Sequence, residues 1–116
     1  MGDPIPLHVA VERRREFRQS TPLRICISGE RVECVNWSLG GFFARGFTGT
    51  MRAGDDIAGV IETAGKSGPF WARVIRCDAA LGELGACFTR LHPEIAAELG
   101  RMTAEARLAA AIAKGR

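Results

Sequence analysis

The fold is decided by residues 23–45, which read LRICISGERVECVNWSLGGFFAR. Apolar and polar residues alternate over Leu23–Ile27, and the alternation stops at Ser28-Gly29-Glu30, which is typical of a hairpin turn. The returning strand is expected at residues 31–35 and ends in a turn that begins at Asn36. A third strand is expected at residues 41–45. The stretch therefore predicts three short antiparallel strands joined by tight turns.

Three more segments of the same kind follow along the chain. Short apolar runs at residues 56–62, 70–76 and 84–91 are separated by turn residues, among them the stretch 64–69 with two glycines and a proline. Six short strands at close spacing favour an antiparallel barrel or sandwich over a parallel α/β sheet. We therefore expect an all-β domain over residues 13–91.

The two ends of the chain differ from this β-rich middle. Residues 1–12 show no sustained period and contain two prolines, so we expect a flexible N-terminal arm. A helix is expected within residues 92–116, because apolar residues recur at helical spacing after Pro93: Ile95, Leu99 and Met102, then Leu108 and Ile112. Gly100 is expected to bend or break this helix, whose apolar face should pack on the mouth of the barrel.

The composition excludes several classes of protein. The 116 residues, 47% hydrophobic and 25% charged, suit one globular domain with a single core rather than a disordered chain. No apolar run approaches the roughly 20 residues that a bilayer-spanning helix needs. The N-terminus also lacks the basic and apolar regions of a signal peptide. We therefore expect a cytoplasmic protein that does not enter a membrane.

The cysteines and the possible nucleophiles give no sign of metal or catalytic chemistry. Cys26, Cys34, Cys77 and Cys87 form no CxxC pair, and both histidines lie far from them in sequence. Structural zinc sites usually show close ligand pairs. We expect half-buried strand cysteines, with no metal, disulfide or cofactor. The sequence also lacks a Ser/His/Asp order and a Walker-type Gly-Lys-Ser/Thr, so we expect no enzymatic activity.

A cluster of arginines precedes the first strand. The net charge of +3 is modest, but four arginines lie close together in the segment Arg13-Arg14-Arg15-Glu16-Phe17-Arg18. The planar fork of arginine can bind phosphate or a guanine edge through two bonds and can stack on rings, which lysine cannot do. A G+C-rich genome explains the overall excess of arginine over lysine, but it does not explain the cluster.

Two short motifs lie on either side of the first predicted strand pair. Arg14 and Arg18 form R-x-x-x-R, and Asn36-Trp37-Ser38-Leu39-Gly40-Gly41 reads N-x-S-x-x-G after the first strand pair. Each motif alone is also typical of a solvated basic segment or of an Asx turn. Together, and followed by the short strands at 72–75 and 84–88, they resemble the PilZ domain family over residues 12–91. The resemblance implies a six-stranded antiparallel β-barrel with a C-terminal helix.

The resemblance also implies a ligand, the second messenger cyclic di-GMP. Each phosphate of this dinucleotide can be met by a charge-assisted, bidentate arginine contact. Arginine also matches the O6 and N7 acceptors of guanine. The residues assigned to the ligand by this resemblance are Arg13, Arg14, Arg18, Asn36, Ser38, Gly40 and Gly41.

The N-x-S-x-x-G segment supplies groups that complement the arginines. The side-chain oxygen of Asn36 can accept hydrogen bonds from the N1–H and N2–H₂ edge of guanine. The hydroxyl of Ser38 can bond either to the ligand or to the turn backbone. Gly40 and Gly41 are expected to permit positive φ and a close approach of the ligand to the backbone.

The two tryptophans have separate roles in this interpretation. Trp71, on the fifth strand, is a candidate for stacking on a guanine at the rim of the barrel, although strand tryptophans are more often part of the core. Trp37 occupies a variable position of the motif and is expected to be exposed or to lie over the barrel end.

The sequence thus predicts a non-catalytic receptor that binds one cyclic di-GMP or a stacked pair. Binding is expected to order residues 1–20 over the barrel end and to create a surface for a downstream protein partner. The controlled process would be motility, biofilm or exopolysaccharide formation. One alternative is an adaptor of the same fold that acts without ligand in pilus or flagellar control. A nucleic-acid-binding barrel is disfavoured because no aromatic-rich stripe is present, so we expect no nucleic-acid polymer as a partner.

Overall fold

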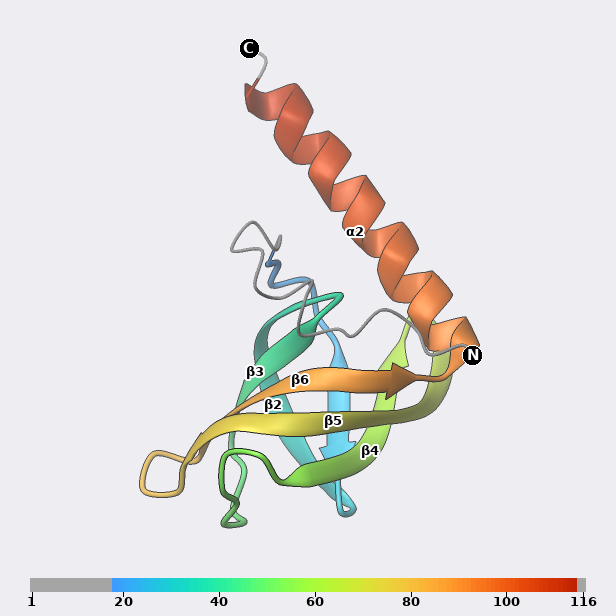
Figure 1. Ribbon diagram of the computed structural model, residues 1–116. Coiled ribbons are helices and arrows are strands. Elements are labelled where there is room, and N and C mark those ends of the chain that lie inside the picture. Colours follow the sequence, from blue (N-terminus) through green and yellow to red (C-terminus); the bar gives the residue numbers. More distant parts are fainter. Residues whose placement is uncertain (1–17, 115–116) are drawn as a thin grey trace.

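The computed structural model describes residues 18–114 as a β-barrel followed by one helix (Figure 1). The strands and the helix are β1 (Arg24–Ile27), β2 (Glu30–Ser38), β3 (Gly41–Arg45), β4 (Asp56–Thr63), β5 (Lys66–Asp78), β6 (Glu83–Leu91) and α2 (Pro93–Lys114). The barrel is closed in the order β1-β2-β3-β6-β5-β4, with antiparallel pairing throughout. The prediction of a six-stranded antiparallel barrel with a C-terminal helix is confirmed.

Strand β1 closes the barrel. Arg24 pairs with Glu33 of β2 on one side and with Glu62 of β4 on the other. Because β1 bonds to both neighbours, the sheet returns to itself, and none of the six strands in residues 18–114 is left as an unpaired edge. This closure excludes the sandwich that the strand pattern alone left open.

Aromatic rings fill the interior of the barrel. Phe42, Phe70 and Phe88 come from three neighbouring strands, and their ring centroids lie 5.6 to 5.8 Å apart. These three rings are at most 2% exposed. Edge-to-face and tilted rings at this spacing add to the free energy gained from burying their area. The alternation along β3, β5 and β6 therefore directs one face of each strand into a single core.

Two hairpins close in two residues each. Ser28 and Gly29 have φ values of 55° and 78°, and Ala64 and Gly65 have values of 51° and 78°. Positive φ at both central residues is the geometry that matches the twist of the flanking strands. The prediction of a longer turn at 64–69 is therefore wrong, since residues 66–69 belong to β5. Pro69 is tolerated there because its carbonyl oxygen accepts a bond from His92 N–H, although its own nitrogen donates none.

Helix α2 covers one end of the barrel with its first half only. Ile95 and Leu99 are fully buried, which confirms the predicted packing of the helix on the barrel mouth. Leu108 and Ile112 are 62% and 56% exposed, and the last turns extend away from the strands (Figure 1). The predicted packing therefore does not apply to this second half. Of the bend or break predicted at Gly100, the break is wrong, because the helix runs through this residue without interruption.

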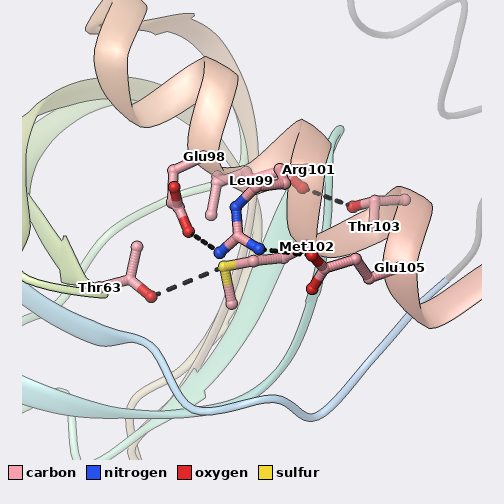
Figure 2. Close-up of polar contacts among 7 residues, drawn as sticks. All are labelled: Thr63, Glu98, Leu99, Arg101, Met102, Thr103 and Glu105. Carbon is pink, nitrogen blue, oxygen red and sulfur yellow. Dashed lines mark hydrogen bonds and ion pairs between the residues drawn. The ribbon is translucent and has the colours of Figure 1, made fainter.

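Polar contacts fix the middle of α2 (Figure 2). Arg101 lies between Glu98 and Glu105 and bonds to both carboxylates. The hydrogen bond from Arg101 lowers the pKa of Glu98 below its usual value, against an opposing effect of burial. On the barrel side, the Thr63 hydroxyl points to the sulfur of Met102 at 3.7 Å. Buried apolar residues thus attach the helix to the barrel, and ion pairs between residues of the helix stabilise the helix itself.

The four cysteines lie on strands, as the alternation of apolar and polar residues predicted. Each is a half-buried residue of a strand, as predicted, and each is a free thiol in the structure. Within residues 18–114, no three side chains of His, Cys, Asp or Glu are grouped so that they could hold a metal ion. In the same range, the structure has no helix with the length and apolar character needed to cross a membrane.

Candidate functional site

Arg18 brings the two sequence motifs together. Its Nε and one terminal nitrogen donate to Asn36 Oδ1 at 2.9 and 2.7 Å, and the other terminal nitrogen donates to Ser38 Oγ at 3.4 Å. The second arginine of R-x-x-x-R is therefore held by both polar residues of N-x-S-x-x-G. Arg13 and Arg14 lie outside the residues that the structure describes, so their predicted contacts stay predictions.

The backbone after Arg18 is fixed to the end of β2. Gln19 and Trp37 exchange two backbone hydrogen bonds of 2.8 and 2.9 Å, and Trp37 Nε1 donates to the carbonyl oxygen of Thr21 at 2.8 Å. Trp37 is fully buried in the core. The prediction that Trp37 is exposed or lies over the barrel end is wrong, because its ring anchors the segment that carries Arg18.

Gln19 is a positioning residue that the sequence did not reveal. Its side chain is buried and donates from Nε2 to Thr103 Oγ1 of α2 at 3.0 Å, and the Thr103 hydroxyl donates to the carbonyl oxygen of Leu99 at 2.8 Å. The hydroxyl of Thr21 donates to Gln19 Oε1 at 3.1 Å. Arg18 is thus one residue away from a hydrogen-bonded link to the C-terminal helix. A single glutamine next to an arginine cluster carries no sequence signal for such a link.

A β-bulge directs Asn36. The pairing of β2 with β3 shifts register between Cys34 and Asn36, so Val35 is an extra residue in the strand. The thiol of Cys34 contacts the carbonyl oxygen of Asn36, with 3.5 Å between sulfur and oxygen. Burial raises the pKa of this thiol to about 12, against a smaller lowering by the Arg18 guanidinium. Cys34 therefore stays protonated near neutral pH and can keep donating to the bulge.

Asn36 and Ser38 belong to a strand rather than to a turn. Strand β2 continues to Ser38, and the chain reverses at Leu39 and Gly40 before β3 begins. The strand predicted to end at residue 35 is therefore longer than expected. Ser38 is 1% exposed, and its Oγ accepts a bond from Gly40 N–H at 3.0 Å. The hydroxyl therefore contacts the backbone of the reversal and Arg18, and its bond to a ligand stays a prediction.

The glycines serve the barrel and not a left-handed turn. Gly41 does not have a positive φ, so this part of the prediction is wrong. A Cβ at Gly41 would lie 2.1 Å from the carbonyl oxygen of Ala86, which shows that glycine is needed for the approach of β6. The carbonyl oxygen of Gly40 accepts a bond from Phe88 N–H at 2.8 Å. The reversal is therefore fastened directly to β6.

A shallow depression of about 230 Å³ lies beside Arg18 on the outer wall of the barrel. Its lining comes from the Arg18 side chain and from three strands with the turn before β3: Gly40, Gly41, Phe42, Phe43, Ile75, Arg76, Gly85, Ala86 and Cys87. A larger depression of about 530 Å³ lies between the start of β1 and the β4–β5 hairpin. Because only the smaller one contains motif residues, it is the candidate site.

Trp71 lies elsewhere on the outer wall. It is 38% exposed and does not line the depression. The guanidinium carbon of Arg90 lies 5.0 Å from the Trp71 ring centroid, as in a cation–π pair. The structure therefore brings Arg18, Asn36, Ser38, Gly40 and Gly41 together, but it does not bring Trp71 to them.

The fold matches one that is known from solved structures. The closed six-stranded barrel with one C-terminal helix is PilZ-like. No family model matches the sequence, and a comparison with curated proteins finds no match. Among solved structures, the Bacillus subtilis inhibitor of motility (MotI/DgrA) is similar, with a TM-score of 0.66 and 19% sequence identity. The match covers 83% of this chain and 51% of that one, so the chain spans about half the length of the neighbour.

Proposed function

We propose that this chain is a non-catalytic receptor domain for cyclic di-GMP that acts in the cytoplasm. The observation that carries the proposal is the contact of Arg18 with both Asn36 and Ser38 beside a depression on the barrel wall. Asn36 and Ser38 follow Arg18 by 18 and 20 residues in sequence, yet both contact its guanidinium group, so the two motifs that define the resemblance meet there. The structural neighbour is named an inhibitor of motility, which supports a regulatory role of this kind.

Arg18 supplies the positive charge of the proposed site. Its guanidinium can bind a phosphate or the O6/N7 edge of guanine while one face remains able to stack on a ring. Arg13 and Arg14 are proposed to add further charge from the preceding segment. The output is proposed to be control of motility, biofilm or exopolysaccharide through a protein partner.

Arg18 and a bound guanine would compete for the side-chain oxygen of Asn36. A carbonyl oxygen has two lone pairs, and Asn36 Oδ1 already accepts two bonds from Arg18. A guanine N1–H that bonds to this oxygen must displace one of them. We therefore assign Asn36 two successive roles, first to position the guanidinium and then to accept from the base.

A calorimetric titration with cyclic di-GMP tests this function. The wild type is expected to bind, and Arg18→Ala is expected to weaken binding about ten- to hundred-fold, because charge-assisted contacts are lost. Arg24→Ala is a matched control, since Arg24 is an exposed strand arginine paired with Glu62 away from the site. Cyclic di-AMP should bind far less well, because it lacks the O6 acceptor. Absence of binding by the wild type would contradict the proposal.

A ligand-independent adaptor is the second candidate, and one observation favours it. The second half of α2 presents Leu108 and Ile112 to solvent beyond the barrel. Such a surface can contact a protein partner whether or not the depression is filled. In this case Leu108→Ser with Ile112→Ser abolishes partner binding, while Arg18→Ala leaves it unchanged.

A further inference from the structure

Three residues form a row across the outer wall of the barrel. Gly85 of β6 pairs with Phe43 of β3 on one side and with Arg76 of β5 on the other. All three line the depression beside Arg18. Because Gly85 has no side chain, the row has an aromatic wall, a bare backbone floor and a cationic wall. A planar ring can stand with its edge over such a floor and its two faces towards the walls, since no side chain projects from Gly85.

The two walls lie in contact with each other and must separate slightly to admit a ring. The guanidinium carbon of Arg76 lies 5.7 Å from the centroid of the Phe43 ring. Planar groups stack at about 3.5 Å, so a ring between two walls needs about 7 Å. Arg76 is exposed, and its flexible side chain can move by the missing ångström without any change in the backbone. The guanidinium carbon of Arg45, two residues further along β3, lies 5.9 Å from the centroid of the same ring.

The charge of Arg76 is left uncompensated by carboxylates. Three other strand arginines pair with carboxylates on neighbouring strands: Arg24 with Glu62, Arg45 with Glu83 and Arg73 with Asp56. Among residues 18–114, Arg76 has no carboxylate within ion-pair distance, and its contact is with the ring of Phe43. With Arg18 at the opposite end of the lining, the depression combines positive charge with a surface for stacking.

Building on the function proposed above, we propose that Phe43, Gly85 and Arg76 form a stacking subsite for a purine ring whose phosphate is bound by Arg18. The base lies over Gly85 with one face on Phe43, and the Arg76 guanidinium closes onto its other face. This subsite takes the place that the sequence had suggested for Trp71. A phosphate without a base does not use it, so the subsite selects purine nucleotides over phosphorylated sugars.

Gly85→Val provides the sharpest test, because it fills the floor without disturbing the fold. A Cβ at residue 85 would lie 3.9 Å from Arg76 Cγ and 4.0 Å from Phe43 Cδ1, which is ordinary contact. Valine also suits a strand better than glycine does. We therefore expect the variant to unfold at no lower denaturant concentration than the wild type and to bind cyclic di-GMP at least about ten-fold more weakly, as loss of base stacking requires.

Two further variants and one control complete the set. Phe43→Leu keeps an apolar side chain but removes the ring, and Arg76→Gln removes the charge. Each is expected to weaken binding of cyclic di-GMP and of GMP about 5- to 150-fold, and neither changes the binding of ribose 5-phosphate. Gly100→Ala is the control, since a Cβ there meets nothing within 4 Å and the position is on α2. Its affinity for cyclic di-GMP should equal that of the wild type.

The outcomes separate the subsite from the proposed function. If the wild type binds cyclic di-GMP and the three variants bind it equally well, the subsite is wrong and the receptor function stands. If the wild type binds GMP but not cyclic di-GMP, and the variants lose GMP, the ligand is wrong and the subsite stands. If the wild type binds neither nucleotide, both are overturned. Perturbation of the Phe43 ring resonances by GMP, but not by ribose 5-phosphate, supports the subsite directly.

Discussion

A single extra residue in β2 decides which side chains of the candidate site face the core and which face outward. From the buried Val32, regular alternation along β2 would place Asn36 inside the barrel and Trp37 outside. The bulge after Cys34 reverses this, so that Trp37 is buried and Asn36 reaches Arg18. A bulge is set by pairing with β3, which the sequence of β2 alone does not contain. For this reason the motif residues could be predicted, but the burial of Trp37 could not.

Ser38 is expected to matter for both stability and binding. Ser38→Ala leaves the N–H of Gly40 without its acceptor inside the reversal and removes one contact of Arg18. The free energy of unfolding should fall by about 1–3 kcal/mol, the cost of an unsatisfied buried donor. Urea denaturation measures the change, with Ser67→Ala, an exposed serine of β5, as the control. A variant as stable as the wild type would show that the hydroxyl does not hold the reversal.

The thiol of Cys34 is expected to make the fold sensitive to alkali. Its pKa rises from 9.0 to about 12 in the folded chain because of burial. The unfolded chain therefore loses this proton first, and the stabilisation present below pH 9 is lost as the pH rises towards 12. The free energy of unfolding should decline over this range, and the decline should be shallower in Cys34→Ala. The chain has no tyrosine, which keeps the titration simple. Equal slopes for both proteins would contradict the role of Cys34.

At the scale of elements, the sequence pattern of the strands predicted their positions and buried faces, whereas the pattern of the helix predicted its position but not how far it packs. All six strands were found because each has a buried face that alternates with an exposed one. The helix was predicted to pack along its length, yet only its first half meets the barrel. Its apolar period continues to Ile112, but the last turns extend beyond the barrel and stay exposed (Figure 1). Gly100 was predicted to bend or break the helix, but the helix continues through it, since one glycine costs only about 1 kcal/mol relative to alanine.

The two halves of α2 are expected to respond differently to the same substitution. Leu99→Ala should lower the free energy of unfolding by about 2–5 kcal/mol, because Leu99 is fully buried against the barrel. Leu108→Ala should change it by less than about 0.5 kcal/mol, because Leu108 is 62% exposed. Chemical denaturation of both variants gives the comparison. A large loss in Leu108→Ala would mean that the second half of the helix is covered in solution.

Arg101 is expected to stabilise the helix only while Glu98 is ionised. The bond from Arg101 lowers the pKa of Glu98 in the folded chain. The contribution is therefore present above the unfolded pKa of 4.5 and is lost as the pH falls below it. Arg101→Gln should reduce the melting temperature at pH 7 and have a smaller effect near pH 3. The same loss at both pH values would show that Arg101 acts through packing and not through the ion pair.

At the scale of the whole molecule, the segment that carries Arg18 and the C-terminal helix are one connected unit. Gln19 joins β2 through its backbone and Thr103 through its side chain. The prediction that binding orders residues 1–20 stays a prediction, and all of these residues before Arg18 lie outside the described range. Neither contact could be read from the sequence, because each joins residues that are distant along the chain.

Gln19 is expected to transmit binding at Arg18 to α2. Addition of cyclic di-GMP should slow hydrogen exchange of the amides in residues 99–103, because the fixed Arg18 also fixes the contact of Gln19 with Thr103. Gln19→Ala should abolish this slowing while the Arg18 contacts to Asn36 and Ser38 remain. Hydrogen-exchange mass spectrometry on both proteins, with and without the dinucleotide, measures it. The same slowing in Gln19→Ala would exclude Gln19 as the connection.

The bond between Gln19 and Thr103 also has a consequence for protein engineering. This bond places the segment that leads into β1 beside α2, the helix that follows the last strand. A domain whose entry and exit are neighbours can be spliced into a surface loop of a host protein without stretching the host. The stretch from Gln19 to Thr103 therefore begins and ends at neighbouring positions and is suited to serve as an insertion cassette.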